Sequence, residues 1–511
     1  MTPEFIAEFM VSLANLNDTS EILEPSSGQG IFLDVLSKKG HKNITAYEVD
    51  PAITSGHSFV INESFVSIKS SQSFDLIIGN PPYIRWKNLE QELKDELSQD
   101  VLWNTYCNSL CDYSSIFIIK AIEMLKSGGQ LIFITPEYWL NTTHSMRLRN
   151  YMLDHGFFEK IYHFNETPIF GKVTVSTVIF KYVKSSNDIK NKIKVAKYYQ
   201  HKKLDSTILD NLKNLIKQES TEYLEIKHFE KNTNWVLAHN EMMAEIELFE
   251  EMCRKDVFSD LLLNEYHTIK DVCDIGNGMV SGLDKAFQVD RNSLTKSERK
   301  YLLKVIKAKD INPFSYNQIT DYLMINEDIS NEDDFKTKFP NFYNHLRAYK
   351  KGLNNRYQYK KKVKYWEWVF PRNFKLFSKN VSRIFVPGKE RISNKDYFRF
   401  TIAGPGIFPT QDVTALFVKE GTKESIYYIL ALLNSRYVFD WLRLKGIIKG
   451  SIVEFSEKPI ASIPFRKIDF GNSNEVAIHD KLSELTEGYI ATMNPQFLLK
   501  INELINQLLS R

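Results

Sequence analysis

The sequence contains few cysteines and no long apolar segment. Four cysteines occur among 511 residues, and their scattered positions form no disulfide framework, which predicts a reducing compartment. No run approaches the roughly eighteen apolar residues that a membrane-spanning helix needs. The N-terminal segment lacks the basic residues that precede the apolar part of a signal peptide. These absences argue against a secreted or membrane protein, and we expect a cytoplasmic one.

Metal-binding patterns are also missing from the sequence. Cys107 and Cys111 share a helical spacing, but no matching His or Cys pair lies near them, as a zinc site would require. We therefore expect core or surface thiols at these positions and no metal site.

Positive charge is concentrated in one region, although the net charge is only +3. Residues 345–400 contain ten Lys and six Arg against three acidic residues, a local excess of +13. A solvated basic face would explain the charge alone. Interleaved aromatic residues favour a nucleic-acid-binding surface, because cations contact phosphates and rings contact bases or sugars. These aromatic residues are Tyr349, Tyr357, Tyr359, Tyr365, Trp366, Trp368, Phe370, Phe374 and Phe377.

The length and the hydrophobic pattern predict two domains, because 511 residues exceed one ordinary domain. In residues 1–220, short apolar strands alternate with helices, which predicts a doubly wound α/β fold. Residues 184–220 are rich in Lys, Asn and Ser, a composition typical of a peripheral segment or linker. Residues 221–511 have a mixed pattern and form the second, α+β domain. The strands are expected at Glu21–Leu23, Ile44–Val49, Phe74–Ile78, Leu131–Ile134 and Val173–Val183, with a helix over Ser115–Leu125 that is closed by Lys126 and the Gly128–Gly129 pair.

A glycine-containing turn follows the first of these strands. Residues 24–30 read EPSSGQG, and a helix is expected from Ile31. Glycines at such a turn let the backbone approach a ligand closely. A dinucleotide fingerprint would place a third glycine at position 33, where Leu33 stands. Glu48 ends the next strand, where a carboxylate suits a ribose diol, so a nucleoside-type cofactor is favoured over a plain tight turn.

The most informative segment is FDLIIGNPPY, residues 74–83. A buried strand leads into Asn80-Pro81-Pro82-Tyr83 at its carboxyl end, where open α/β sheets bind ligands. The prolines fix the backbone, so the Asn80 amide and the Pro81 carbonyl can both accept hydrogen bonds from an amino group. This arrangement directs the nitrogen lone pair at an electrophile, and Tyr83 can stack on a planar base. A Pro-rich turn without function is disfavoured by the upstream elements.

Together these segments resemble the gamma class of DNA amino-methyltransferases, which act on the N6 atom of adenine in restriction–modification systems and are typified by the TaqI methyltransferase. The order of an N-terminal motif, a cofactor loop, Asn-Pro-Pro-Tyr and a long C-terminal region is the gamma order. The resemblance implies an S-adenosylmethionine-dependent methyltransferase fold with a separate target-recognition domain. It also implies that Phe170 stacks on the target base. The cofactor-binding residues that it implies are Thr2, Glu24, Ser26, Gly28, Gly30, Glu48, Ser64, Phe65, Pro82 and Phe117.

One position departs from the family pattern. The family usually places an acid where the adenine of the cofactor binds, and this sequence has Ser64 followed by Phe65. A serine hydroxyl can still accept a hydrogen bond. Glu63 is the alternative acceptor.

The resemblance implies a mechanism without a covalent intermediate. A flipped adenine lies between Tyr83 and Phe170, and donates its amino hydrogens to Asn80 and Pro81 before methyl transfer. Residues 1–220 form the catalytic domain, and residues 221–511 recognise double-stranded DNA. A cognate restriction endonuclease is expected as a separate protein of the same bacterial or archaeal cell, and methyl transfer requires no metal. We expect phosphate contacts from Lys360, Lys361, Lys362 and Lys364.

Other functions share parts of this pattern. Amino-methyltransferases acting on RNA or on protein glutamine carry the same tetrapeptide, but they are generally shorter and lack a C-terminal region of this size. Methylation of cytosine N4 more often uses Ser or Asp before Pro-Pro-Tyr. Methylation of cytosine at carbon 5 needs a cysteine nucleophile, usually after proline, and none of the four cysteines follows a proline. A DNA-binding subunit with a decayed catalytic half is disfavoured by the intact residues 80–83.

Overall fold

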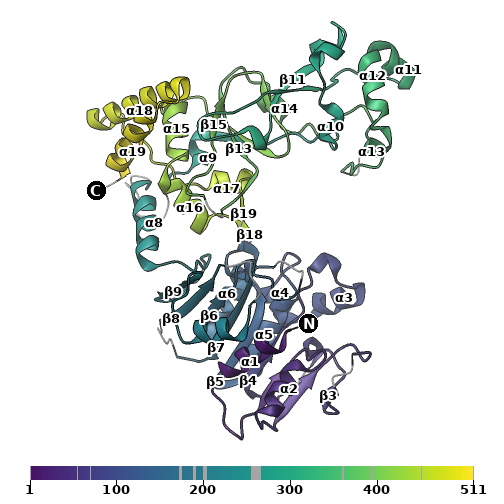
Figure 1. Ribbon diagram of the computed structural model, residues 1–511, viewed down its shortest axis with the longest axis vertical. Coiled ribbons are helices and arrows are strands. Elements are labelled where there is room, and N and C mark those ends of the chain that lie inside the picture. Colours follow the sequence, from purple (N-terminus) through teal and green to yellow (C-terminus); the bar gives the residue numbers. More distant parts are fainter. Residues whose placement is uncertain are drawn as a thin grey trace. The chain divides into compact units, whose positions relative to one another are not determined.

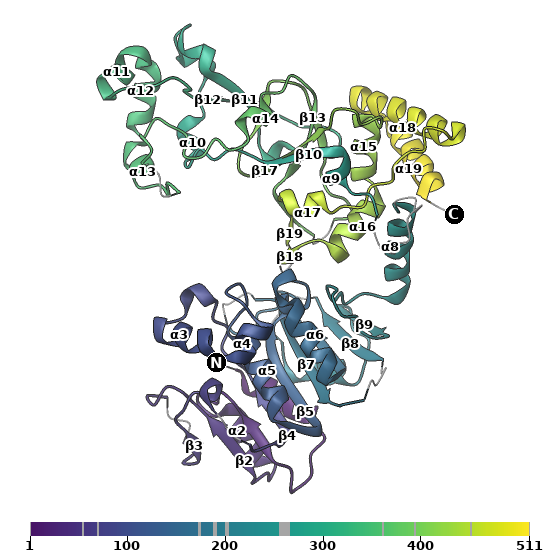
Figure 2. The same cartoon turned by 180° about the vertical axis from the view of Figure 1, so that it is seen from behind.

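The computed structural model describes residues 2–53, 56–68, 71–171, 175–187, 192–199, 204–254, 266–359, 362–392, 395–449 and 452–509. The chain forms two compact units (Figures 1 and 2). The first comprises Met1–Ala244 with Ile448–Ser451, and the second comprises Glu245–Ile447 with Ile452–Arg511. No described helix is long and apolar enough to cross a membrane.

The first unit is built around one mixed sheet with the strand order β3-β2-β1-β4-β5-β7-β6-β8-β9. The strands β3, β2, β1, β4 and β5 are parallel, whereas β7 is antiparallel to both of its neighbours. Their bounds are β1 (Ile22–Glu24), β2 (Ile44–Tyr47), β3 (Val60–Ile61), β4 (Phe74–Gly79), β5 (Leu125–Pro136), β6 (Gly156–His163), β7 (Thr177–Lys184), β8 (Ile193–Tyr198) and β9 (Thr221–Ile226). This sheet confirms the predicted α/β class.

Helices cover both faces of the sheet (Figures 1 and 2). One buried cluster joins α5 and α6 to the sheet, and another joins α1, α2 and α7 to the opposite face. The central strands read as continuous apolar runs because both faces are covered. The helices are α1 (Glu4–Ser12), α2 (Ile31–Lys38), α3 (Gln91–Gln99), α4 (Val101–Tyr106), α5 (Ser114–Met124), α6 (Met146–His155) and α7 (Ser206–Lys213).

Several boundaries differ from the sequence predictions. The strand predicted over Val173–Val183 begins at Thr177, and the strand predicted over Leu131–Ile134 extends over Leu125–Pro136. The pair Gly128–Gly129 lies within β5 and does not close α5, which ends at Met124. Residues 184–220, predicted as a peripheral segment or linker, contain β8 and α7. The two units divide after Ala244 rather than after residue 220, because β9 pairs with β8 and so belongs to the first sheet. The Lys-, Asn- and Ser-rich composition of residues 184–220 obscured the apolar residues by which β8 and α7 could have been predicted.

The second unit contains smaller sheets, one of them with the strand order β10-β17-β13-β15 and another with the order β12-β11-β16. Its strands are β10 (Cys273–Asn277), β11 (Leu302–Ile306), β12 (Thr320–Leu323), β13 (Arg383–Pro387), β14 (Lys389–Arg391), β15 (Thr401–Ala403), β16 (Ile407–Pro409), β17 (Val413–Val418) and β19 (Ile452–Glu454), whereas β18 (Ile448–Lys449) groups with the first unit. The main helices are α8 (Asn240–Met252), which crosses the division, α11 (Glu332–Lys338), α12 (Pro340–Arg347), α13 (Lys350–Asn354), α15 (Ile426–Leu433), α16 (Arg436–Lys445), α18 (Ser473–Thr492) and α19 (Pro495–Leu509). Shorter helices are α9 (Ile269–Val272), α10 (Asp284–Phe287), α14 (Phe374–Phe377) and α17 (Glu457–Ala461).

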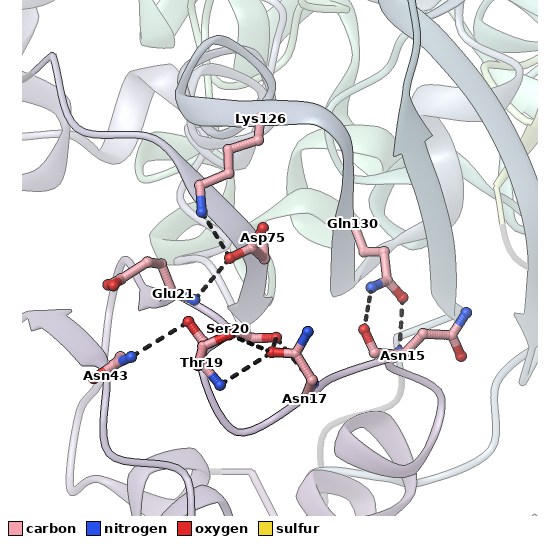
Figure 3. Close-up of polar contacts among 9 residues, drawn as sticks. All are labelled: Asn15, Asn17, Thr19, Ser20, Glu21, Asn43, Asp75, Lys126 and Gln130. Atoms are coloured by element: carbon pink, nitrogen blue, oxygen red, sulfur yellow. Dashed lines mark hydrogen bonds and ion pairs between the residues drawn. The ribbon is translucent and has the colours of Figure 1, made fainter.

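Polar side chains fix the amino ends of β1, β4 and β5 (Figure 3). One Asp75 carboxylate oxygen accepts hydrogen bonds from the Glu21 amide and the Lys126 ammonium, each at 2.8 Å. Burial raises the pKa of Asp75, but these donors outweigh it and lower the pKa overall. Gln130 exchanges two hydrogen bonds with the Asn15 backbone, at 2.8 and 2.9 Å. These contacts hold the strand ends in register.

We expect Asp75→Asn to lower the free energy of unfolding at neutral pH by about 1 kcal/mol, because a charge-assisted hydrogen bond at a partly exposed position is lost. A carboxylate with a lowered pKa stabilises the fold above its unfolded pKa, and this contribution is lost as the pH falls through the folded pKa. Urea unfolding should therefore show the difference at pH 7 and a smaller one in acid. Asp18→Asn, an exposed neighbour, is the control, and equal midpoints for Asp75→Asn and wild type would contradict the account.

Candidate active site

The loop after β1 adopts the backbone conformation that glycine favours. Gly28 and Gly30 have φ values of 52° and 84°, in the left-handed region that costs other residues energy. A side chain at Gly28 would meet open space, so the backbone conformation explains the residue. The Gly28 N–H donates to Glu48 at 2.8 Å. The loop is therefore tied to the end of β2.

Glu48 lies where β2 ends, and it is 8% exposed. Besides Gly28, its other carboxylate oxygen accepts a hydrogen bond from the Asp50 N–H at 3.0 Å. Ser27 adds a backbone bond to the Tyr47 carbonyl at 2.8 Å. Each carboxylate oxygen can accept a second bond, so Glu48 retains capacity for a ligand.

Three buried polar atoms at this edge of the sheet have no hydrogen-bond partner among the described residues. They are a carboxylate oxygen of Glu24, the Ser27 hydroxyl and the amide oxygen of Asn80. Buried polar atoms are normally paired. All three residues line one cavity of about 140 Å³, together with Thr2, Ser26, Gly28, Gln29, Ile31 and Phe32. Such unpaired acceptors favour a ligand that supplies donors.

Among the residues that line the cavity, Glu24 has a carboxyl pKa that is strongly shifted by its surroundings. Its side chain is almost fully buried, and burial raises its pKa well above the ordinary value, with repulsion from Glu48 as a second cause. A cationic group next to Glu24 would favour the ionised form. The cavity therefore suits a ligand with a positive charge.

Asn80 follows β4, between the cofactor loop and the N-terminal segment. Its amide nitrogen donates to the Thr2 hydroxyl at 3.0 Å, and the Ser26 hydroxyl donates to its backbone carbonyl at 3.2 Å. The first bond fixes the orientation of the amide, because the nitrogen is committed to Thr2. The amide oxygen is left as the acceptor.

The rings of Tyr83 and Phe170 lie edge to face near the end of β4. Their ring centroids are 6.1 Å apart with an interplanar angle of 70°. The Tyr83 hydroxyl donates to the Ile134 carbonyl at 2.8 Å, which fixes the ring. Burial raises the pKa of Tyr83, and Tyr138 and Asp112 raise it further. Tyr83 is therefore a neutral aromatic surface and not a base.

The predicted adenine-binding residues of the cofactor lie together but are more enclosed than the loop. Phe65 and Phe117 have ring centroids 5.3 Å apart, and both are buried in the core. Tyr113 hydrogen-bonds Ser64, and burial raises the pKa of Tyr113 to about 12. Ser64 therefore already has a partner within the protein.

The sequence analysis missed several residues near the site. Ser27 and Gln29 line the cavity, and the EPSSGQG segment itself contained this signal. Val49 is 66% exposed beside Glu48, which is unusual for an apolar residue at a strand end. Asp112 accepts a hydrogen bond from Tyr138 at 2.7 Å, and no local pattern connects these two residues with Tyr83.

The four lysines predicted to contact DNA differ in their surroundings. Lys360 and Lys361 lie outside the described residues. Lys362 is exposed. The Lys364 ammonium donates to the Ile329 carbonyl and lies 5.6 Å from the centre of the Trp366 ring. Of the described pair, Lys362 is the one with an exposed side chain.

Four of the nine interleaved aromatic residues are core residues, which contradicts the sequence interpretation for those four. Tyr365, Trp366, Trp368 and Phe377 are each at most 5% exposed. Many of the positive charges around them have hydrogen-bond or ion-pair partners within the protein. Lys350, Arg356, Lys364, Arg372, Lys379, Arg383, Lys395 and Arg399 bond carboxylates or backbone carbonyls.

The comparisons with known proteins agree on one family. Residues 26–170 match the model of the Eco57I restriction-modification methylases. The chain is 46% identical to the type II methyltransferase M.HindII of Haemophilus influenzae, over 98% of this chain and 95% of that protein. It is 43% identical to the type II methyltransferase M.HincII of Haemophilus influenzae, over the same shares.

A solved structure shares the fold across both units. The type IIL restriction-modification enzyme MmeI, solved in complex with DNA, aligns with 99% of this chain and 72% of that chain at a TM-score of 0.62. The sequence identity is 12%, so this similarity shows the fold alone.

Glu24→Gln should stabilise the protein in the absence of ligands. A carboxyl whose folded pKa is raised destabilises the fold as the pH rises above its unfolded pKa. At pH 8 the variant should melt about 2–4 °C higher than wild type, the shift that about 1 kcal/mol produces in a unit of this size. Near pH 4 the difference should shrink. Glu21→Gln serves as the matched control, and equal melting curves at pH 8 would contradict the burial argument.

Proposed function

The chain belongs to the type II methyltransferases of restriction–modification systems, and we propose that it methylates the N6 amino group of adenine in duplex DNA. It is a DNA methyltransferase, and S-adenosylmethionine is its methyl donor. The main observation in favour of this proposal is the buried, unpaired amide oxygen of Asn80, directly after β4. The hydrogen bond from the Asn80 amide nitrogen to the Thr2 hydroxyl orients this oxygen. This is the acceptor that an exocyclic amino group requires.

The acceptors that line the cavity after β1 suit the methionine part of the cofactor. When bound, S-adenosylmethionine supplies an electrophilic methyl group on a sulfonium sulfur. Glu24 would accept the ammonium group of its methionine part, and Glu48 would accept the ribose hydroxyls. The unpaired oxygen of Glu24 supports this assignment. We further assign to the cofactor the predicted residues Thr2, Ser26, Gly28, Gly30, Ser64, Phe65, Pro82 and Phe117, and we add Ser27 and the exposed Val49.

Asn80 and Pro81 would prepare the target nitrogen. The Asn80 amide oxygen and the Pro81 carbonyl each accept one amino hydrogen, so the nitrogen lone pair leaves conjugation with the ring and points at the methyl group. Because Thr2 already holds the amide, no reorientation is needed during the reaction, which is the condition for electrostatic preorganisation. Catalysis then consists of positioning and charge stabilisation.

Tyr83 and Phe170 would hold the target base after it flips out of the duplex. A base inside the helix cannot reach a recessed acceptor, so enzymes of this kind extrude it. The centroids of the two rings are 6.1 Å apart, with the rings edge to face. We propose that the base packs against both rings, which requires Phe170 to move aside or the rings to separate.

The second unit, Glu245–Ile447 with Ile452–Arg511, would recognise the DNA sequence. Its shared fold with the DNA-bound MmeI enzyme supports this role. We propose that Lys362 contacts a phosphate, and that a separate cognate restriction endonuclease cuts the same sequence. Methylation would then protect the host DNA.

Asn80→Ala should reduce single-turnover methyl transfer at least about a hundredfold, because one preorganised polar group is lost. Binding of S-adenosylmethionine should stay within a few fold, since Glu24 and Glu48 remain. Asn88→Ala, an exposed asparagine downstream, should transfer at the wild-type rate. Near-wild-type transfer by Asn80→Ala would sink the assignment.

Glu48→Ala should weaken binding of S-adenosylmethionine by roughly 1–3 kcal/mol in calorimetric titration, because the ribose loses a charged acceptor and Gly28 loses its partner. Asp50→Ala removes a nearby exposed carboxylate and should bind normally. Unchanged affinity in Glu48→Ala would remove Glu48 from the cofactor site.

A further inference from the structure

Two tyrosine rings project into solvent from the connection between α13 and α14. Tyr357 is 71% exposed and Tyr359 is 43% exposed, whereas Tyr365, Trp366 and Trp368 of the same connection are buried. Their ring centroids are 4.8 Å apart at 63°, and the Tyr359 ring lies 5.6 Å from that of Phe370. The three rings therefore form one continuous aromatic surface. We call Tyr357 and Tyr359 the tyrosine pair.

The backbone on either side of the tyrosine pair is held firmly. The Arg356 guanidinium donates to the carbonyls of Ser281, Lys364 and Glu367, at 2.8, 3.0 and 2.5 Å. Phe370 exchanges two backbone hydrogen bonds with Val280, at 2.9 and 3.0 Å. The exposed rings are thus presented on a fixed base, which lowers the entropy that a partner would have to remove.

Tyr359 also has a strained backbone. Its φ is 51°, a left-handed conformation that is an outlier for a bulky residue. Such strain persists only where the surrounding structure enforces it, and it concentrates at functional positions. The neighbouring Gln358 side chain accepts a hydrogen bond from the Val363 N–H at 3.2 Å. Exposure and strain are two independent signs of a binding surface.

The charge near the tyrosine pair in the sequence indicates the kind of partner. Lys362, three residues after Tyr359, is exposed, and Arg347 and Lys351 are exposed on α12 and α13, which precede the tyrosine pair in the sequence. Glu367 is the nearest acid in this segment, and it is committed to the Lys364 N–H at 3.0 Å. Exposed rings and exposed cations close together in the sequence match the chemistry of a nucleic acid, whose sugars and bases contact rings and whose phosphates contact cations.

We propose that the tyrosine pair is a contact surface for duplex DNA, at which the two rings pack against sugars and base edges while Lys362 contacts a phosphate. The proposal rests on the DNA methyltransferase function and extends it to named side chains of the second unit. Ring packing and phosphate contact differ in their salt dependence, because only the phosphate contact releases counterions.

The test measures binding of the full-length protein to a mixed-sequence DNA duplex across a salt series. Replacing both rings, Tyr357→Ala with Tyr359→Ala, should weaken binding about tenfold at every salt concentration and leave the salt slope unchanged. Replacing them with Phe should restore binding to within a few fold. Lys362→Ala should instead lower the slope by about one unit. Tyr397→Ala is the matched control, since Tyr397 is also 43% exposed.

Two outcomes would overturn the proposal: unchanged affinity of the double Ala variant, or an equal loss in the double Phe variant. The thermal unfolding curve of each variant, compared with wild type, checks that the second unit is folded. If the wild-type protein itself neither binds nor methylates duplex DNA, the proposed function fails first. If wild type does both and the double Ala variant equals it, only the tyrosine contact fails.

Discussion

The site depends on one constraint: buried polar atoms need partners, and the carboxyl edge of β1 and β4 leaves three without one among the described residues. Side-chain atoms of His163, Ser176, Thr177 and Gln218 in the first unit also lack a partner within the described part of the chain, but Glu24, Ser27 and Asn80 differ in that they line one cavity together. At the opposite strand ends, the network around Asp75 is paired within the protein (Figure 3). The unpaired acceptors of Glu24, Ser27 and Asn80 therefore indicate a ligand. The hydrogen bond from Asn80 to Thr2 decides which amide atom faces that ligand.

The same residues make the unit less stable when it is empty. Glu24 lies beside Glu48 in a buried position, and both effects raise its pKa. A methyl donor with an ammonium group and a sulfonium would relieve this repulsion. The arrangement is typical of binding sites, where groups are arranged for a ligand and not for the free protein.

Local patterns predicted the α/β class of the first unit correctly. The strands before Glu24, Glu48 and Asn80 are short apolar runs that end in polar residues, and strand and motif lie within ten residues of each other in the sequence. The burial of aromatic residues around position 365 could not be predicted from the sequence. Trp366 and Trp368 are buried by residues that lie far away in the sequence. Arg383 is equally misleading, since its guanidinium is buried against carbonyls that a sequence pattern does not place beside it. Composition therefore could not show which basic residues are paired within the protein and which are exposed. For the same reason it could not show that Tyr357 and Tyr359 are exposed while Tyr365, Trp366 and Trp368 are buried.

In the proposed function, Asn80 and Pro81 direct methyl transfer to the exocyclic nitrogen of adenine. The most direct test is to incubate the protein with unmethylated DNA and methyl-labelled S-adenosylmethionine, digest the product to nucleosides and identify the labelled one by mass spectrometry. We predict N6-methyldeoxyadenosine as the labelled nucleoside. Label in N4-methyldeoxycytidine, or in no nucleoside, would contradict the account.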